Sequence, residues 1–429
     1  MSDIVYWIWL SLCCTPDTST FPKLLEKFGT AKNIYDSDDG DISKCVGFKN
    51  SDRSKLLEKN LDRASEIYAF CQKHNVGLLC YNDEKYPSAL RDISSPPVLL
   101  YYRGTLVDFD KAFCVAGVGT RSLSDYGRRN AFKISYDLAS AGATIVSGMA
   151  IGIDGVCHAG AIAGGGTTVA VLGSGIDVCY PSQHLTLARE IVKHGCVLTE
   201  YAPGTQPNKI NFPKRNRIIS GLSSATVVFE GRERSGSLIT ARYAKEQGRR
   251  VFALPASVGT KHSEVSNLLI KNGAGLCTCA DDILNDFYDV YSGVINPFKL
   301  PKTMTVNMMD ALRSLQVSAV CQGDDIFVPS HFKSREKTKD TEKRKETNVI
   351  LEQKEETVQN SENNVEPPPN FDKQALKVYK KIPPEGECGI ESLVDGEMNM
   401  RDVMKALLKL EMNKLVILHP GEKVSRKSK

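Results

Sequence analysis

A short segment that combines basic residues with one aromatic ring, residues 209–217, is the most unusual stretch of the sequence. Lys209, Lys214, Arg215 and Arg217 gather there around Phe212, just ahead of a predicted helix. Basic side chains bind phosphates, and an aromatic ring can stack on bases, each stacked base contributing roughly 1–3 kcal/mol to single-strand binding. A solvated basic loop is the alternative, but Phe212 gains nothing in such a loop unless it packs or stacks. The segment therefore favours an interaction with single-stranded nucleic acid.

A glycine-rich loop with one arginine, residues 117–127, offers a second phosphate-binding element. Gly119 lets the backbone approach an anion, Thr120 and Ser124 bring hydroxyl groups, and the planar guanidinium of Arg121 fits phosphate oxygens. Taken alone, the loop is explained equally well as an ordinary glycine turn with a surface arginine. Ser122 or Ser124 can also serve as a helix cap. The loop is not the dinucleotide-binding fingerprint, because Ser122 stands where its third glycine belongs.

Two further turns follow strand-like segments. Residues 147–154 contain Gly148 and lead into a helix that carries His158. A later helix opens on Ser235, Gly236 and Ser237, whose backbone N–H groups could hold a phosphate. Both interpretations have structural alternatives, because His158 can be a packed histidine and either serine can simply cap its helix.

The elements that must position these turns alternate between strands and helices. Short apolar runs rich in β-branched residues are separated by amphipathic stretches of helical length. The predicted strands are Phe113–Val118, Ala143–Ser147, Thr167–Leu172, Cys196–Thr199, Ala225–Phe229, Arg250–Leu254 and Gly275–Thr278. This alternation predicts an α/β fold with a parallel sheet flanked by helices, and ligands bind outside the carboxyl ends of such strands. The glycines predicted to end helices in the left-handed conformation are Gly142, Gly195, Gly248 and Gly273.

The first 80 residues are predicted to form a small helical domain. Residues 21–28 have apolar side chains at helical spacing ahead of Gly29, and one further helix is predicted over residues 56–67. The apolar run Ile4–Cys14 is expected to be a buried helix. We expect neither a signal sequence nor a membrane span here, because Asp3 replaces the basic flank and the run is too short for a bilayer.

A charged linker and a second small domain follow the central domain, which is assigned to residues 81–295. Residues 296–369 form an extension and, from about residue 331, a stretch too poor in hydrophobic residues to fold, which is predicted to be a disordered linker. Residues 370–429 are predicted to form a winged helix, with three short helices followed by a strand hairpin. The three helices are Asp372–Lys381, Ile390–Asp395 and Met400–Leu410.

Composition adds few constraints. A length of 429 residues suits two or three domains, and a net charge of +4 means that any nucleic-acid role must come from a local patch. The 13 cysteines are scattered without metal-ligand spacing, so free thiols in a reducing cytoplasm are expected. No cofactor, metal site or membrane segment is predicted.

Five strings in the central domain are specific as a series. They are G-T-R-S-L-S-D-Y-G, S-G-M-A-I-G-I-D, A-V-L-G-S-G-I-D-V-C-Y-P, F-P-K-R-N-R-I-I-S-G-L-S and S-G-S-L-I-T-A-R-Y-A-K-E-Q-G-R. In this order and spacing, over about residues 86–282, they resemble the DprA/Smf family (DNA-processing protein A). The resemblance implies an extended Rossmann-like fold that binds single-stranded DNA in a basic pocket. It also implies a bacterial homodimer that protects incoming DNA and loads the RecA recombinase during natural transformation.

The resemblance further implies roles for single residues. Arg121 and Lys209 would contact phosphates, and Phe212 would stack on a base. Arg215 and Arg217 would line or brace the pocket, one of them serving structure by pairing with Glu230 or another carboxylate. The glycine turns, including Gly148 and residues 235–237, would hold phosphates through backbone N–H groups. Little base preference is expected, because stacking and phosphate contacts read no base edges.

The sequence departs from the family pattern at several points. Ile151 stands where the family usually has arginine, the proline–glycine after the sixth strand reads Pro255-Ala256, and a later glycine-containing turn reads Val265-Ser266-Asn267. The N-terminal domain lacks the G-x-G hairpin of a helix-hairpin-helix phosphate grip, so DNA binding is not expected there. In the last domain a basic stripe, facing either DNA or solvent, is formed by Arg401, Lys405 and Lys409.

Two other functional classes remain as alternatives. The central fold also resembles the nucleoside-monophosphate phosphoribohydrolases (the LOG family), whose motif P-G-G-x-G-T-x-x-E carries the catalytic glutamate. This chain has R-S-G-S-L-I-T-A-R at that place, without a carboxylate, and no Ser/His/Asp set, metal cluster or Walker lysine stands out. A non-catalytic protein is therefore expected. The other alternative is a regulator that binds duplex DNA through the winged helix.

Overall fold

The computed structural model describes most of the chain before residue 318 and much of it after residue 372. Described are residues 3–45, 49–232, 235–260, 264–301, 303–317, 373–384, 387–394, 398, 400–412, 415–419 and 423–426. The described residues up to 317 belong to one compact unit and those from 373 to a second. The predicted linker, residues 331–369, lies outside the described residues.

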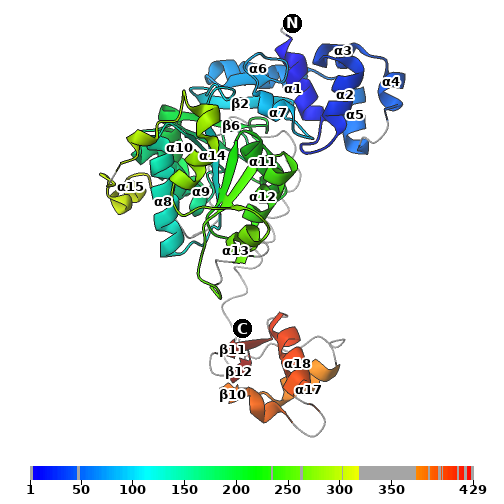
Figure 1. Ribbon diagram of the computed structural model, residues 1–429. Coiled ribbons are helices and arrows are strands. Elements are labelled where there is room, and N and C mark those ends of the chain that lie inside the picture. The colour runs from blue at the N-terminus through cyan, green and yellow to red at the C-terminus, as the bar shows by residue number, and fades with distance from the viewer. Residues whose placement is uncertain are drawn as a thin grey trace, which may run out of the picture. The chain divides into compact units, whose positions relative to one another are not determined.

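One nine-stranded sheet forms the centre of the first unit (Figure 1). Its strands are β1 (Gly77–Cys80), β2 (Leu99–Gly104), β3 (Cys114–Val118), β4 (Thr144–Ser147), β5 (Thr168–Val171), β6 (Gly195–Thr199), β7 (Ala225–Val228), β8 (Arg250–Ala253) and β9 (Gly275–Leu276). They lie in the order β1-β2-β6-β5-β4-β3-β7-β8-β9, and the strands from β3 to β9 pair in parallel. Each predicted strand is present, and the α/β class with a Rossmann-like parallel core is confirmed.

The sheet ends in two antiparallel strands that the sequence pattern does not predict. β2 pairs antiparallel with β1 and with β6, and Tyr101 lies opposite Thr199. The pattern places residues 77–80 in the helical domain and predicts no strand over residues 99–104, whereas the structure has a strand at each place. β1 is held by its pairing with β2, and β2 is also held by β6, which is distant in sequence. A local sequence pattern cannot predict such pairing.

The chain leaves the central strand β3 in two directions. It runs through β4 and β5 to β6 on one side, then returns to the other side of β3 and continues through β7, β8 and β9. In open parallel sheets this reversal leaves a crevice at the carboxyl ends of the central strands, where ligands bind. The predicted site loops that contain Arg121, Gly148 and Ser235 follow β3, β4 and β7, respectively.

Helices cover both faces of the sheet (Figure 1). One face carries α8 (Asp125–Ser140), α9 (Ile153–Ala163), α10 (Leu185–His194) and α14 (Asp281–Tyr291). The other carries α11 (Asn211–Gly221), α12 (Gly236–Glu246) and α13 (Glu264–Lys271). Each face has its own buried core, so the neighbouring residues Ile145 and Val146 of β4 belong to different cores.

Three of the four glycines predicted to end helices have the left-handed conformation. Their φ angles are +104° for Gly142, +70° for Gly248 and +84° for Gly273. The prediction is wrong for Gly195, whose φ of 166° is extended and which begins β6. Close approach explains glycine there instead, because a Cβ atom would lie 2.2 Å from the carbonyl oxygen of Thr168.

The N-terminal part of the first unit is helical, as predicted. Its described helices are α1 (Ile4–Cys13), α2 (Thr20–Phe28), α3 (Ala31–Asp36), α4 (Asp39–Ser43), α5 (Asn50–Glu58) and α6 (Asp62–Lys73). The apolar run forms α1, where Trp7 and Trp9 are buried. The single helix predicted over residues 56–67 is instead divided between α5 and α6, because Lys59 adopts the left-handed conformation with a φ of +44°.

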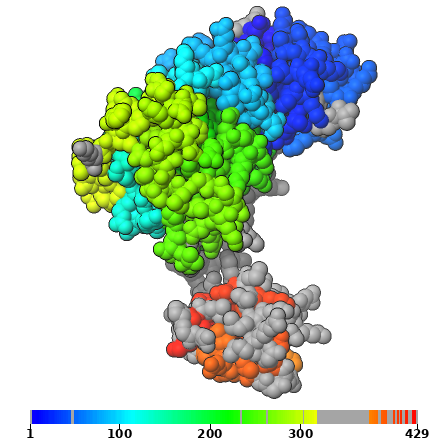
Figure 2. Space-filling view, viewed as in Figure 1, coloured from blue at the N-terminus to red at the C-terminus, as the bar shows by residue number. Residues whose placement is uncertain are grey.

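These N-terminal helices lie directly against the rest of the first unit, which contains the sheet (Figure 2).

Short helical segments complete the first unit. They are α7 (Ser88–Arg91), η1 (Ser182–His184), η2 (Pro297–Lys299) and α15 (Met308–Ser314). Within the described residues, no helix is long and apolar enough to cross a membrane.

The second unit combines helices with a small antiparallel sheet of order β10-β12-β11. Its elements are α17 (Lys373–Lys381), β10 (Glu387–Gly389), η3 (Ile390–Leu393), α18 (Met400–Met412), β11 (Val416–His419) and β12 (Lys423–Arg426). The first and third predicted helices and the hairpin are present, whereas the second is only a four-residue 3₁₀-helix. The winged helix itself stays a prediction. So does the basic stripe, because the side chains of Arg401 and Lys405 lie outside the described part of the chain.

Candidate nucleic-acid interface

A small pocket lies at the carboxyl ends of β3, β4 and β5. Its lining consists of Arg121, Gly148, Ala150, Ile151, Tyr180, Pro181 and Phe212. Arg121 comes from the loop after β3, and Gly148 from the loop after β4. Tyr180 follows β5, and Phe212 lies in the first turn of α11. Three residues predicted from separate motifs are thus brought to one place.

Phe212 provides a ring at the wall of this pocket. The ring centroids of Phe212 and Tyr180 are 5.3 Å apart, and their planes are inclined by 33°. The guanidinium carbon of Arg121 lies 5.8 Å from the Phe212 centroid, within cation–π range. Gly173 makes room for the ring, because a Cβ atom there would come within 2.7 Å of it. The pocket therefore combines two half-buried rings with one cation.

Phe212 belongs to helix α11 rather than to a segment ahead of it. The helix begins at Asn211, so the predicted boundary after Arg217 is wrong. Pro213 is tolerated because the first turn of a helix has free N–H groups in any case. Lys209 precedes the helix in an exposed turn, next to Ile210, which is 63% exposed. Lys209 is not part of the pocket lining.

The loop after β3 approaches the loop after β4 through its glycines. A Cβ atom on Gly119 would lie 2.5 Å from the side chain of Ile153, and one on Gly152 would lie 2.4 Å from the carbonyl oxygen of Thr120. Gly152 also has a φ of +93°, which disfavours any side chain. Arg121 is exposed at the tip of this loop, and no ion pair within the described residues neutralises it.

Ser124 has a structural role that the sequence partly predicts. Its Oγ accepts a hydrogen bond of 3.0 Å from the backbone N–H of Gly127, so it caps α8. The hydroxyl of Ser124 donates to Glu230, and its backbone N–H donates to the Oε2 of Glu230 at 2.9 Å. The predicted cap is confirmed, and contact with DNA stays a prediction.

The turn at residues 235–237 lies beside α11 but outside the pocket lining. The hydroxyls of Ser235 and Ser237 are 2.6 Å apart, and Ser235 makes no side-chain cap to α12. Asn216 of α11 donates to the carbonyl oxygen of Gly236 at 3.4 Å. The turn is thus linked to the helix that carries Phe212, and its predicted phosphate contacts remain untested.

Arg215 is buried beneath the pocket. Its Nη1 donates to the carbonyl oxygens of Gly148, at 2.9 Å, and Val171. A Cβ atom on Gly148 would lie 2.5 Å from Arg215 Nη2 and 2.6 Å from Asp154 Oδ2, so only glycine fits above these two groups. Burial lowers the pKa of Arg215 to about 10, against the opposing effect of Asp154. Burial also raises the pKa of Asp154 to about 6, although Arg215 lowers it. Arg215 ties the loop after β4 to the end of β5.

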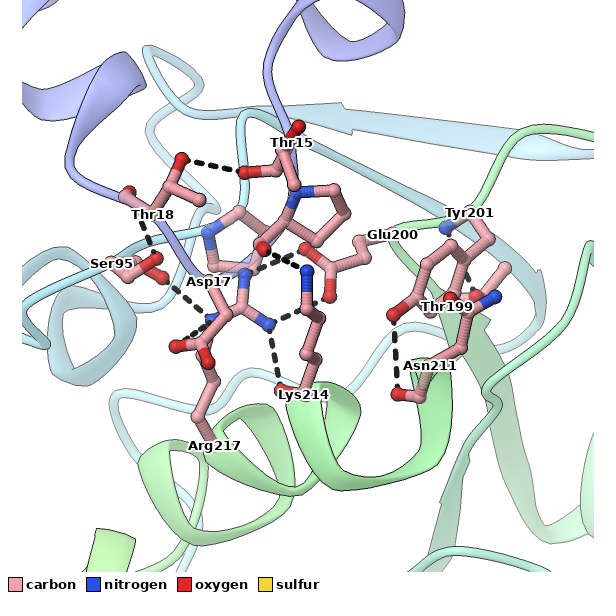
Figure 3. Close-up of polar contacts among 12 residues, drawn as sticks. Thr15, Asp17, Thr18, Ser95, Thr199, Glu200, Tyr201, Asn211, Lys214 and Arg217 are labelled. Carbon is pink, nitrogen blue, oxygen red and sulfur yellow. Dashed lines mark hydrogen bonds and ion pairs between the residues drawn. The ribbon is translucent and has the colours of Figure 1, made fainter. Parts of the chain in front are cut away.

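Arg217 is buried further along α11 than Phe212 and pairs with a carboxylate that the sequence does not identify. Its guanidinium makes bonds of 2.7 Å and 2.6 Å to Glu200, and its Nε donates to the carbonyl oxygen of Ser95 at 2.9 Å (Figure 3). Asp17 is a weaker partner at 3.8 Å. Burial lowers the pKa of Arg217, but Glu200 more than offsets this effect, and the net shift is upward. The expected partner is Glu230 or another carboxylate. Glu200 is that other carboxylate, and Glu230 instead accepts hydrogen bonds from Ser124.

Lys214 is also engaged away from the pocket. Its Nζ donates to the carbonyl oxygen of Pro16 at 3.0 Å, while the hydroxyl of Tyr243 donates to Asp17 at 2.8 Å. Burial lowers the pKa of Lys214, as do Lys49 and Arg217. Figure 3 shows Asp17 and Lys214 beside Arg217, where the loop after α1 meets α11. The N-terminal helices and the site helix are therefore joined by polar contacts.

His158 is a packed histidine, the structural alternative that the sequence leaves open. It is fully buried, and its Nδ1 lies 2.7 Å from the hydroxyl oxygen of Thr168. Burial lowers the pKa of His158 to about 3, and the charges of His184 and Arg215 act in the same direction. His158 is therefore neutral at ordinary pH and does not face the pocket.

Four lining residues are absent from the site predicted by sequence: Ala150, Ile151, Tyr180 and Pro181. Ile151 makes the part of the pocket wall that it lines apolar. Tyr180 could have been predicted from sequence, because it is an aromatic residue that follows the glycine turn after β5. Metal ligation has no support in the described part of the chain, where no group of three His, Cys, Asp or Glu residues could hold an ion.

Comparisons with known proteins identify the family of the chain. The model of the family "DNA recombination-mediator protein A" matches residues 77–288. Protein Smf of Synechocystis is 36% identical over 291 residues, which cover 66% of this chain and 72% of that protein. DNA processing protein DprA of Streptococcus pneumoniae is 45% identical over 250 residues, covering 58% of this chain and 86% of the relative.

A solved structure of a family member is similar to this chain as well. The crystal structure of DprA from Streptococcus pneumoniae superimposes with a TM-score of 0.58 at 35% identity, over 67% of this chain and 98% of that one. The residues matched by the family model, 77–288, include the nine strands of the sheet and the loops of the pocket. The chain belongs to the DNA recombination-mediator protein A family, which includes DprA and Smf.

Proposed function

We propose that this protein binds single-stranded DNA in the pocket formed by Arg121, Tyr180 and Phe212. The observation that carries the proposal is the juxtaposition of two aromatic rings, 5.3 Å apart, with an exposed guanidinium 5.8 Å from one of them. A base stacks on a ring, and its phosphate accepts hydrogen bonds from the guanidinium. Because neither contact reads base edges, binding is insensitive to base sequence.

Single strands are preferred because of the position of Phe212. Its ring is half-buried in a pocket between loops, and a base must leave a duplex stack to reach it. Unpaired bases reach it without that cost. Lys209 and the loop of Gly119 and Thr120 extend the phosphate contacts on either side. Arg215 braces the loop after β4, and Arg217 holds α11 through Glu200.

The binding is proposed to be non-catalytic. Two carboxylates beside the pocket loops have structural surroundings. Glu230 accepts hydrogen bonds from Ser124, and Asp154 is buried against Gly148 and Arg215. Family membership supports a role in natural transformation and recombination in the bacterial cytoplasm. By the same membership, we propose that a homodimer protects single strands and loads the RecA recombinase on them.

The test is fluorescence anisotropy of a labelled single strand and its duplex, titrated over salt. We expect the single strand to bind more tightly. In Arg121→Ala/Lys209→Ala, affinity should fall at least about tenfold, since charge-assisted bonds contribute about 1.5–3 kcal/mol each. The dependence of log affinity on log salt should become shallower by about 0.7 for each lost phosphate contact.

A matched control removes the same charge elsewhere. Arg129 of α8 and Lys271 of α13 are exposed and lie outside the pocket lining. Arg129→Ala/Lys271→Ala should titrate like the wild type. Equal titrations of wild type and Arg121→Ala/Lys209→Ala would refute the assigned pocket, and tighter duplex binding would favour the regulator that acts through the C-terminal unit.

A further inference from the structure

A second cavity, of about 410 Å³, shares the loop after β5 with the DNA pocket. Residues 176–179 of that loop line the cavity, and the next two residues line the pocket. The remaining walls come mainly from α6, β2, β6 and α10, together with Met149 of the loop after β4. Protein interiors hold few voids larger than a water molecule, whereas sites for small molecules occupy about 300–1,000 Å³. The volume therefore corresponds to a small-molecule site.

Most of the cavity wall is apolar. The apolar side chains that enclose it include Phe70, Leu172, Ile176, Leu185, Val192 and Val197. A ligand body that removes this surface from water is stabilised by about 25 cal/mol for each Å² buried. The wall thus selects an apolar body.

Two arginines line the cavity, one half-buried and one exposed. They are Arg103 of β2 and Arg189 of α10, respectively. The Nε of Arg103 is buried without a hydrogen-bond acceptor, and no ion pair among the described residues engages either arginine. Asp177 also lines the cavity, but its Oδ1 already accepts a 2.8 Å bond from the backbone N–H of Gly204. A buried donor without an acceptor is costly, so Arg103 favours an anion, and the exposed guanidinium of Arg189 lies in the same wall.

We propose that this cavity binds a small amphipathic anion, with its apolar body against the aliphatic wall and its anionic group at Arg103 and Arg189. The cavity and the DNA pocket have no lining residue in common, although the loops after β4 and β5 contribute to both. Planar guanidinium groups suit the oxygens of a carboxylate or a phosphate. The apolar lining excludes a highly charged ligand.

The test is isothermal titration calorimetry of the full chain with decanoate, below its micelle concentration, and with decan-1-ol as the uncharged probe of equal length. We expect one decanoate to bind per chain, at least about tenfold more tightly than the alcohol. Arg103→Gln and Arg189→Gln should each reduce this preference. Val192→Trp should fill the cavity and abolish binding of both probes.

The control is Arg129→Gln, which removes a charge from the exposed surface of α8 and should bind like the wild type. Thermal unfolding followed by circular dichroism establishes that each variant is folded. Arg189→Gln, on an exposed helical position, keeps the test decisive if Arg103→Gln disturbs β2. Absence of decanoate binding by the wild type, or unchanged binding in Arg189→Gln and Val192→Trp, would overturn the proposal.

Discussion

Replacing Arg217 with methionine is expected to lower the free energy of unfolding by about 3–5 kcal/mol, because it leaves the Glu200 carboxylate buried without its partner. The two side chains are only 3% and 5% exposed, so water cannot replace the lost bonds. The substitution also removes the donor to Ser95. Denaturant unfolding can be followed through Trp7 and Trp9, which are buried in α1.

Two variants separate this effect from a general loss of charge. Arg250→Met breaks an ion pair with Asp286 whose side chains are 58% and 36% exposed, and it should cost less than about 1 kcal/mol. Arg217→Met/Glu200→Leu removes both buried charges and should recover much of the lost stability. If Arg217→Met is no more harmful than Arg250→Met, the buried pair does not hold α11 in place.

Replacing Phe212 with alanine is expected to weaken single-strand binding about 5- to 150-fold, the equivalent of losing one stacked base at 1–3 kcal/mol. The dependence of affinity on salt should stay unchanged, because the ring neutralises no phosphate. Phe212→Trp should retain binding. Anisotropy titrations at several salt concentrations measure both quantities.

Phe298→Ala is the matched control, since that ring is 94% exposed and lies in η2, outside the pocket lining. It should bind DNA like the wild type. If Phe212→Ala binds normally, the ring only packs against Gly173 and does not stack on a base. If the salt dependence changes as well, the substitution has displaced Arg121.

The central sheet could be predicted from sequence because its signals are local. A run such as Ala225–Val228 is buried on both faces, and turn glycines such as Gly248 follow the helices. β1 and β2 give no such signal, since their stability depends on pairing across the sheet. The break at Lys59 is also invisible, because lysine is an ordinary helix residue and nothing in its type announces a left-handed φ.

The candidate site could be predicted only in part, for a related reason. Glycines and basic residues mark the loops after β3 and β4, and their shared sheet edge brings Arg121 and Gly148 together. Which arginine binds and which one braces depends on partners that are remote in sequence. Arg217 pairs with Glu200 and approaches Asp17, whereas Arg121 is left exposed. The burial of the side chain distinguishes a bracing arginine from a binding one, whereas the residue type is the same in both.

Photo-crosslinking tests most directly whether DNA occupies the pocket. A single strand carrying 5-iodouracil is irradiated in complex with the full chain, and the crosslinked residues are identified by mass spectrometry. We expect crosslinks at Phe212 and Tyr180, the two rings of the pocket, with loss of the Phe212 crosslink in Phe212→Ala. Crosslinks confined to residues 373–426, or to the N-terminal helices, would contradict the assignment of single-strand binding to this pocket.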